Sequence, residues 1–193
     1  YEKLKTNENL YHLLLAQHGL LNATMADQDE DLFDDHYKKA KDNSEELIDA
    51  NYQVANAKAM LSAIYGWEMA YSPYKGMFLG GKSSSTIAEA SKLDPSSPIV
   101  WQVYGSSKLF TPEMWGGDTK LALEYFEKAV QLYEANDTQN ASNWRYLDAL
   151  AWLGQAYEAN DQSDMAKKVY KKAFEIAPDF GWVKHALLPS INE

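Results

Sequence analysis

The stretch LAWLGQAYEANDQSDMAKKVYKKAFEIAP, residues 150–178, decides the fold, because its apolar side chains recur at three- and four-residue steps in two consecutive runs. That spacing predicts two amphipathic helices. Gly154 and Ala166 are small enough to let the two backbones approach, and Tyr157 and Tyr170 are placed to fill the space beside them. The proline that closes the stretch stops the second helix, because proline lacks a backbone donor. We therefore expect an antiparallel helix pair.

The same pattern recurs earlier in the chain, which indicates a repeat array. Superposing Gly66 on Gly105, a shift of 39 residues, also places Pro73 on Pro112. A period of this length is typical of stacked helix pairs. No segment has the sustained period-two alternation of a half-buried strand, so the expected class is all-α.

This pattern resembles the tetratricopeptide repeat (TPR), with the most specific match in residues 150–178. Seven of the eight signature positions are matched there, by Leu153, Gly154, Tyr157, Ala166, Tyr170, Ala173 and Pro178. At the eighth, Leu150 stands where the family usually has Trp. The earlier copies match fewer positions toward the N-terminus. The third copy keeps Trp101, Gly105, Ala122, Phe126 and Ala129, the second keeps Ala90 and Pro95, and the first keeps Phe33, Tyr37 and Ala40.

The resemblance implies a right-handed superhelix of antiparallel helix pairs forming a single domain over residues 1–193, with three to four copies. Their approximate bounds are 6–42, 45–95, 97–134 and 143–178, followed by a C-terminal capping helix over 179–193. Inside this frame, the cap-like cluster Asp42-Asn43-Ser44 predicts the start of a long helix that ends at Ser72-Pro73.

Two neighbouring copies carry extra length between their helices. In the third copy this piece is TPEMWGGD, residues 111–118. In the second, Gly76, Gly80 and Gly81 are expected to form a loop before a helix from Thr86 to Leu93. Extensions of this kind are similar to those of a bacterial, often exported, group of TPR-like proteins. The sequence starts at Tyr1 rather than Met, as a processed precursor would, so export to the periplasm or cell envelope is slightly favoured over the cytoplasm.

Composition excludes several functions. The 18 Lys and Arg against 28 Asp and Glu give a net charge of −10, which disfavours nucleic acid as a partner. The chain has no Cys, so thiol catalysis, disulfide scaffolds and Cys-based zinc sites are ruled out. No apolar run approaches the ~18 residues that cross a bilayer, so no membrane span is expected.

Residues 76–83, GMFLGGKS, satisfy the pattern of a phosphate-binding loop. Such a loop needs a buried strand before it, and here the end of a helix and a turn precede it, so nucleotide binding is not expected. The preferred interpretation is a Gly-rich hairpin loop in which residues 83–85, three serines, cap the next helix.

Residues 27–31, DQDED, begin like a calcium-binding loop, but Leu32 and Lys38 stand where Gly and a bidentate Glu are needed. We interpret them as the acidic start of a helix, which complements the helix dipole. The four histidines have no metal-ligand spacing. No metal, cofactor or catalytic residue is therefore expected.

By analogy with the family, the first helix of each pair lines a concave groove that binds peptides or partner helices. The residues expected to line it are Met60, Trp67, Tyr71, Gln102, Ser106, Asp148, Gln155 and Glu158. Asp148 and Glu158 would repel an acidic peptide, so a basic or apolar partner is the better fit. The aromatic side chains among them could equally be core residues.

The resemblance therefore implies a non-enzymatic scaffold that binds a protein or peptide. The alternative is a glycan- or polymer-binding accessory protein of an exported bacterial assembly. It is favoured by 6 Trp, 13 Tyr and 6 Phe, because aromatic rings stack on sugar faces. Self-association through a terminal copy is left open.

Overall fold

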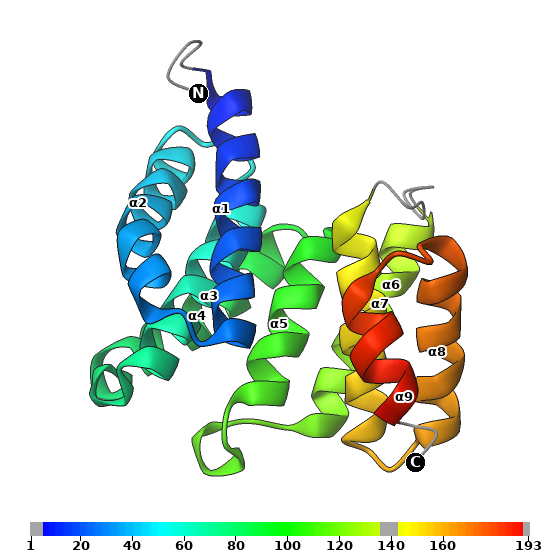
Figure 1. Ribbon diagram of the computed structural model, residues 1–193. Helices are drawn as coiled ribbons and strands as arrows, with labels where there is room; N and C mark the ends of the chain where they lie inside the picture. The colour runs from blue at the N-terminus through cyan, green and yellow to red at the C-terminus, as the bar shows by residue number, and fades with distance from the viewer. Residues whose placement is uncertain (1–5, 136–142, 191–193) are drawn as a thin grey trace. The chain divides into compact units, whose positions relative to one another are not determined.

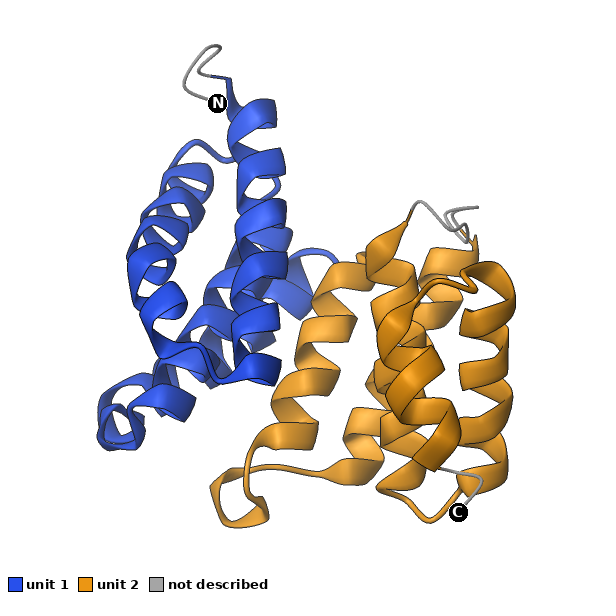
Figure 2. Cartoon of the chain, in the orientation of Figure 1, with its two compact units in different colours: residues 1–95 blue, residues 96–193 orange. Residues whose placement is uncertain are grey.

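The computed structural model describes residues 6–135 and 143–190, and that part of the chain is built of helices without strands (Figure 1). The predicted all-α class is thereby confirmed. Its contacts divide the chain into two compact units, unit 1 over residues 1–95 and unit 2 over residues 96–193 (Figure 2). Whether the whole chain acts as one repeat domain stays a prediction.

Unit 1 consists of helices that pack in chain order. They are α1 (Asn7–Asp27), α2 (Glu30–Asp49), α3 (Val54–Tyr71), η1 (Pro73–Lys75) and α4 (Gly76–Leu93). Each long helix contacts the next, and they alternate in direction, so the α1–α2 and α3–α4 turns lie at the same end of the unit (Figure 1). The core contains Leu10, Leu14, Phe33, Leu47 and Ile64, all almost completely buried.

The helix expected to start after Asp42-Asn43-Ser44 does not start there, and that prediction was wrong. α2 runs through these residues and ends at Asp49. The Ser44 hydroxyl donates to the Ala40 carbonyl 2.8 Å away, and the Asn43 amide donates to Gln17 on α1 at 2.7 Å. Both polar side chains thus find a hydrogen-bond partner inside a packed helix. The break comes instead at residues 50–53.

The glycine-rich stretch was expected to be a loop, and this too was wrong. Gly76, Gly80 and Gly81 all belong to α4, which begins directly after the single turn of η1. Ser83 does not cap a helix. It is buried, and its hydroxyl donates to the Ser62 carbonyl at 3.0 Å while the Ser62 hydroxyl donates to the Ser83 carbonyl at 2.9 Å. This reciprocal pair joins α3 to α4, and it leaves no phosphate-binding loop in this stretch.

Unit 2 repeats the arrangement. Its elements are α5 (Pro98–Phe110), η2 (Glu113–Trp115), α6 (Thr119–Ala135), α7 (Trp144–Glu158), α8 (Ser163–Ile176), η3 (Val183–Leu187) and α9 (Leu188–Ser190). α5 pairs with α6, α7 pairs with α8, and α6 contacts α7 between the pairs. The core includes Phe126, Tyr146, Leu150 and Tyr170, each almost completely buried.

The extended turn between α5 and α6 forms as expected, and its residues explain its shape. Gly116 has φ +96°, a backbone conformation that L side chains rarely adopt. A Cβ on Gly117 would lie 1.7 Å from the Thr111 carbonyl oxygen. The Asp118 carboxylate accepts hydrogen bonds from the backbone N–H groups of Lys120 and Leu121, both at 3.0 Å, and so begins α6.

The signature glycines differ in what they contact. A Cβ on Gly154 would lie 2.0 Å from the Tyr170 ring, and one on Gly105 would lie 3.0 Å from the Phe126 ring. Close helix approach against an aromatic ring thus explains these two glycines. A Cβ on Gly66 would have nothing within 4 Å. The shift of 39 residues that places Gly66 on Gly105 places Ile87 on Phe126. Ile87 has no aromatic ring, so no ring packs against Gly66.

The C-terminal capping helix is present over the described residues, and Ile191 to Glu193 lie outside them. Val183 and Leu187 are buried against unit 2's core. The segment Val183–Leu187 is π-helical, with the Leu188 N–H donating to the Val183 carbonyl. Pro189 follows immediately, and a proline disturbs regular α-helical geometry one turn before it.

Candidate functional site

A polar network joins three helices of unit 2. The Gln102 side chain on α5 donates to the Asp148 carboxylate on α7 at 2.7 Å. Its amide oxygen accepts a hydrogen bond from the Tyr133 hydroxyl on α6 at 3.0 Å. Two residues that the groove analogy names, 46 positions apart in sequence, therefore contact each other.

The Asp148 carboxylate is an unfavourable place for a negative charge. Burial raises its pKa to about 6, although neighbouring Arg145 and hydrogen bonds from the side chains of Trp152 and Gln102 act in the opposite direction. At neutral pH, Arg145 and these hydrogen bonds therefore do not fully offset the cost of burying the ionised Asp148 carboxylate.

Beside this network lie four aromatic rings, each in contact with the next, in the order Phe110, Trp152, Trp182 and Phe180, here called the aromatic row. Trp152 is central. Its ring centroid is 5.1 Å from Phe110, at an interplanar angle of 84°, and 4.7 Å from Trp182, at 65°. Phe180 meets Trp182 at 6.4 Å. Phe110 is 60% exposed and the other three are half-buried, so the row reaches the surface at Phe110, while Trp152 hydrogen-bonds to Asp148.

The remaining groove candidates of unit 2 are held by local bonds. The Ser106 hydroxyl donates to the Gln102 carbonyl at 3.2 Å. Glu158 accepts a hydrogen bond from the Tyr170 hydroxyl at 2.7 Å, and this helps raise the pKa of that hydroxyl, after burial. Gln155 is half-buried on α7. Glu158 is therefore already engaged in holding α8 against α7.

The groove candidates of unit 1 lie on α3 at different depths. Met60 has no exposed surface, so no partner can contact it in this conformation. Trp67 is half-buried and meets the His18 ring edge-on at 4.8 Å. Tyr71 packs against Phe33 at 4.7 Å, and its hydroxyl donates to the Thr24 carbonyl at 2.7 Å.

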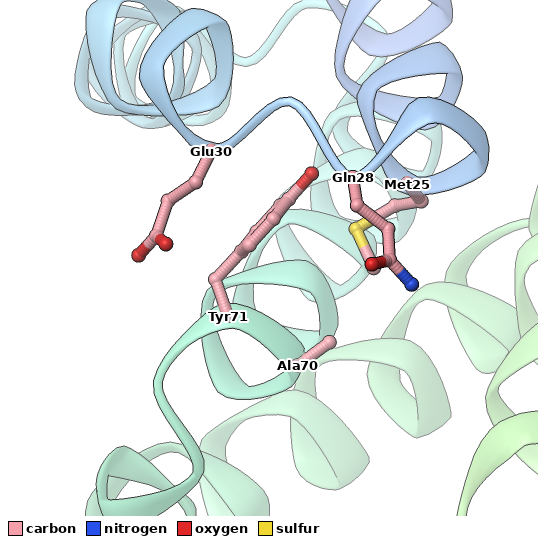
Figure 3. A pocket seen from close by; sticks show the side chains of 5 residues that line it. All are labelled: Met25, Gln28, Glu30, Ala70 and Tyr71. Carbon is pink, nitrogen blue, oxygen red and sulfur yellow. The ribbon is translucent and has the colours of Figure 1, made fainter.

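Tyr71 also lines an open pocket of about 320 Å³ between the end of α3 and the α1–α2 turn. The other lining residues are Met25, Gln28, Glu30 and Ala70. Glu30 lies on one side of the Tyr71 ring, and Gln28 and Met25 lie on the other (Figure 3). The pocket thus combines apolar contact from Met25, Ala70 and Tyr71 with polar groups from Gln28 and Glu30.

Residues 27–31 have the predicted helix-start role. The Asp29 carboxylate accepts a hydrogen bond from the Leu32 N–H at 3.0 Å and caps α2. Reading this stretch only as a cap missed that Gln28 and Glu30 line a pocket. The aromatic row was also missed, because nothing in the local pattern of residues 150–178 separates Trp152 from the core positions beside it.

The described residues contain no group of three His, Asp or Glu side chains arranged to hold a metal ion. Within residues 6–135 and 143–190, no helix is both long and apolar enough to cross a membrane.

Comparisons with known proteins agree with the fold. Residues 147–180 match the tetratricopeptide repeat family model. TTC0263, a thermophilic TPR protein of Thermus thermophilus, is 15% identical with a TM-score of 0.63, over 97% of this chain and 100% of that one. The HusA haemophore from Porphyromonas gingivalis is 21% identical with a TM-score of 0.59, over 79% and 73%. MamA is 18% identical with a TM-score of 0.53, over 84% and 81%. No curated protein matches the sequence.

The fold and its helix pairs define a helical-repeat protein. More particularly, residues 147–180 match the TPR family, and the chain has a TPR-like fold. Proteins of this fold are in general scaffolds for protein–protein interaction and are typically non-catalytic.

Proposed function

We propose that this chain is a non-enzymatic scaffold that binds a basic segment of a protein or peptide on unit 2. The observation that carries the proposal is the aromatic row beside the half-buried Asp148. Recognition combines a charge contact at Asp148 with ring contacts along the row.

The electrostatics support a cationic partner. Because burial holds the pKa of Asp148 at about 6, the ionised carboxylate gains from any cation brought beside it. Arg145 does not fill this role completely, because the pKa stays raised in its presence. Its guanidinium also lies over the Trp144 ring, 4.6 Å from the centroid.

The aromatic row supports the same partner, because Lys and Arg side chains are attracted to ring faces. Unit 2 already contains such a contact, with the Lys128 ammonium 3.5 Å from the Trp101 ring centroid. A Lys or Arg side chain has an apolar stem that suits the rings of the row and a cationic head that suits the Asp148 carboxylate beside Trp152.

The test uses a fluorescent peptide of alternating Arg and Gly, with an Asp–Gly peptide of equal length as control, followed by anisotropy. We expect binding of the basic peptide only, with affinity several-fold weaker for Phe110→Ala and for Asp148→Asn. Because Asp148 becomes protonated, affinity should also fall between pH 7.5 and pH 5.

Two matched variants separate this site from general attraction to an acidic protein. Asp164→Asn removes the same charge from an exposed position on α8, and Trp115→Ala removes an aromatic ring, 59% exposed, that is outside the aromatic row. Neither should change the affinity. Equal loss in Asp164→Asn and Asp148→Asn would contradict the proposal.

The aromatic row also favours a second candidate, a glycan- or polymer-binding accessory protein, because exposed rings stack on sugars. The two functions differ in their dependence on Asp148. Binding on a glycan array that is lost in Phe110→Ala but unchanged in Asp148→Asn would select the glycan function.

A further inference from the structure

The α3–α4 turn of unit 1 presents large apolar side chains to solvent. Tyr74 is 71% exposed, Met77 is 82% exposed and Phe78 is 70% exposed. These three residues, with exposed Lys82, are here called the apolar tip. Phe78 and Lys82 are four residues apart on α4, so they share one face of the helix. The helix pairs of unit 1 already have their core without any of these side chains.

The apolar tip is locally cationic in an acidic chain. Residues 69–88 contain Lys75 and Lys82 and no Asp or Glu, although the chain carries a net charge of −10. Lys75 is paired with Glu68 at 3.0 Å. Lys82 forms no ion pair among the described residues. The surface therefore suits a partner that is both apolar and acidic.

A surface of that chemistry exists at the same end of unit 1. The α1–α2 turn carries Asp27, Asp29, Glu30 and Asp31, all exposed, and no ion pair in the described part of the chain involves them. The turn borders the pocket that Met25, Ala70 and Tyr71 line (Figure 3). The pocket has a mixed lining, with apolar contact from Met25, Ala70 and Tyr71 and polar groups from Gln28 and Glu30. The turn adds negative charge, so the two together complement the apolar and cationic side chains of the apolar tip.

We propose that unit 1 associates with a second copy of this chain, the apolar tip of each copy binding the acidic α1–α2 turn and pocket of the other. In a two-fold symmetric dimer, each copy uses the same surface patch. The apolar tip and the acidic turn must therefore lie close together on each copy, and the symmetry then forms the contact between them twice. The two hairpin turns meet this condition, since they lie at the same end of the unit (Figure 1).

An anionic membrane is the other natural partner for exposed aromatic and Lys side chains. The acidic turn at the same end and the net charge of −10 oppose it. The second copy, in contrast, is attracted by both halves of the patch. This interaction does not involve the aromatic row of unit 2, so the dimer and the peptide-binding function are tested independently.

The experiment measures the mass of the full chain in solution by sedimentation velocity across a range of concentrations. We expect a dimer in low salt, and weaker association in about 0.5 M salt, where the Debye length is only a few Å. Phe78→Ser should weaken the dimer at least tenfold. Met114→Ser is the matched control, since Met114 is 86% exposed at the corresponding turn of unit 2.

A charge exchange tests the specific pairing. Lys82→Glu and Glu30→Lys should each weaken association, and the chain carrying both should recover it, because the contact is re-formed with the signs reversed. Circular dichroism confirms that each variant is folded. A monomer at all concentrations in low salt would overturn the proposal, as would equal effects of Phe78→Ser and Met114→Ser or a double variant that fails to recover. Binding to vesicles containing phosphatidylserine, without a dimer, would identify the membrane instead.

Discussion

Gly154 is the signature glycine at which α7 packs against α8. Its missing side chain is matched by the buried Tyr170 ring, and the Tyr170 hydroxyl reaches back to Glu158 on α7. A single glycine thus permits an aromatic contact and a hydrogen bond between two helices.

Gly154→Ala should destabilise the protein by about 1–3 kcal/mol, because the added Cβ would lie 2.0 Å from the fully buried Tyr170 ring. Gly66→Ala is the control, because its Cβ meets nothing and alanine favours the helix by about 1 kcal/mol. Urea unfolding of both variants gives the comparison. Equal destabilisation of the two would show that Gly154 is not a packing residue.

Asp148 lies in an environment that disfavours its negative charge. A carboxyl whose folded-state pKa is raised stabilises the fold fully below its ordinary pKa, and this contribution is lost as pH rises toward the folded value. For Asp148 the window runs from an ordinary 3.8 to about 6.

Asp148→Asn removes this dependence while keeping a hydrogen-bond acceptor for Gln102. Relative to the native chain, the variant should therefore gain roughly 1–3 kcal/mol of stability between pH 4 and pH 7.5. Chemical unfolding at a series of pH values measures the difference. A difference that stays constant with pH would mean that Asp148 is solvated like an ordinary surface carboxylate.

At the scale of elements, α4 is where sequence and structure differ most. Its first turns contain Gly76, Gly80 and Gly81, which are typical of loops, yet they are helical. The reciprocal hydrogen bonds between Ser62 and Ser83 hold this part of α4 against α3. Tertiary contact therefore overrides a poor local propensity for helix.

The double change Gly80→Ala and Gly81→Ala tests this assignment. Neither added Cβ meets an atom within 4 Å, so the variant should be more stable by about 1–2 kcal/mol from helix propensity alone. Thermal unfolding followed by circular dichroism measures the gain. A loss of stability would indicate that residues 80 and 81 need glycine's backbone freedom and are not helical.

At the scale of the molecule, each unit has a hydrophobic core of its own. The buried cluster around Phe33 draws only on residues of unit 1, and the cluster around Phe126 only on residues of unit 2. Five of the six tryptophans belong to unit 2, with Trp67 the exception. Tryptophan fluorescence therefore reports mainly on unit 2, while circular dichroism reports on both.

Phe126→Ala should destabilise unit 2 by about 3–5 kcal/mol and shift the fluorescence transition. Phe33→Ala, an equivalent cavity in unit 1, should shift the circular dichroism transition and leave most of the fluorescence transition in place. If both variants shift both transitions equally, the two units unfold as one cooperative body.

The candidate site was partly predictable from sequence. Gln102 and Asp148 were predicted from repeat register, because register places equivalent positions on the same helix face, and Tyr71 was included as a neighbour of the register positions on its helix. Register does not say which neighbour a side chain meets. The bond between Gln102 and Asp148, and the row formed by Trp152 with Phe110, depend on how separate helices pack.

The sequence by itself determined the helix pairs and the extended turn at residues 111–118, because periodicity, small residues and prolines act within one or two turns of the chain. Only the tertiary structure decided that Asn43 and Ser83 are interior helix residues rather than caps. The physical reason is that a polar side chain caps a helix or stays within one according to the partner it finds, and Gln17 and Ser62 come from elements distant in sequence.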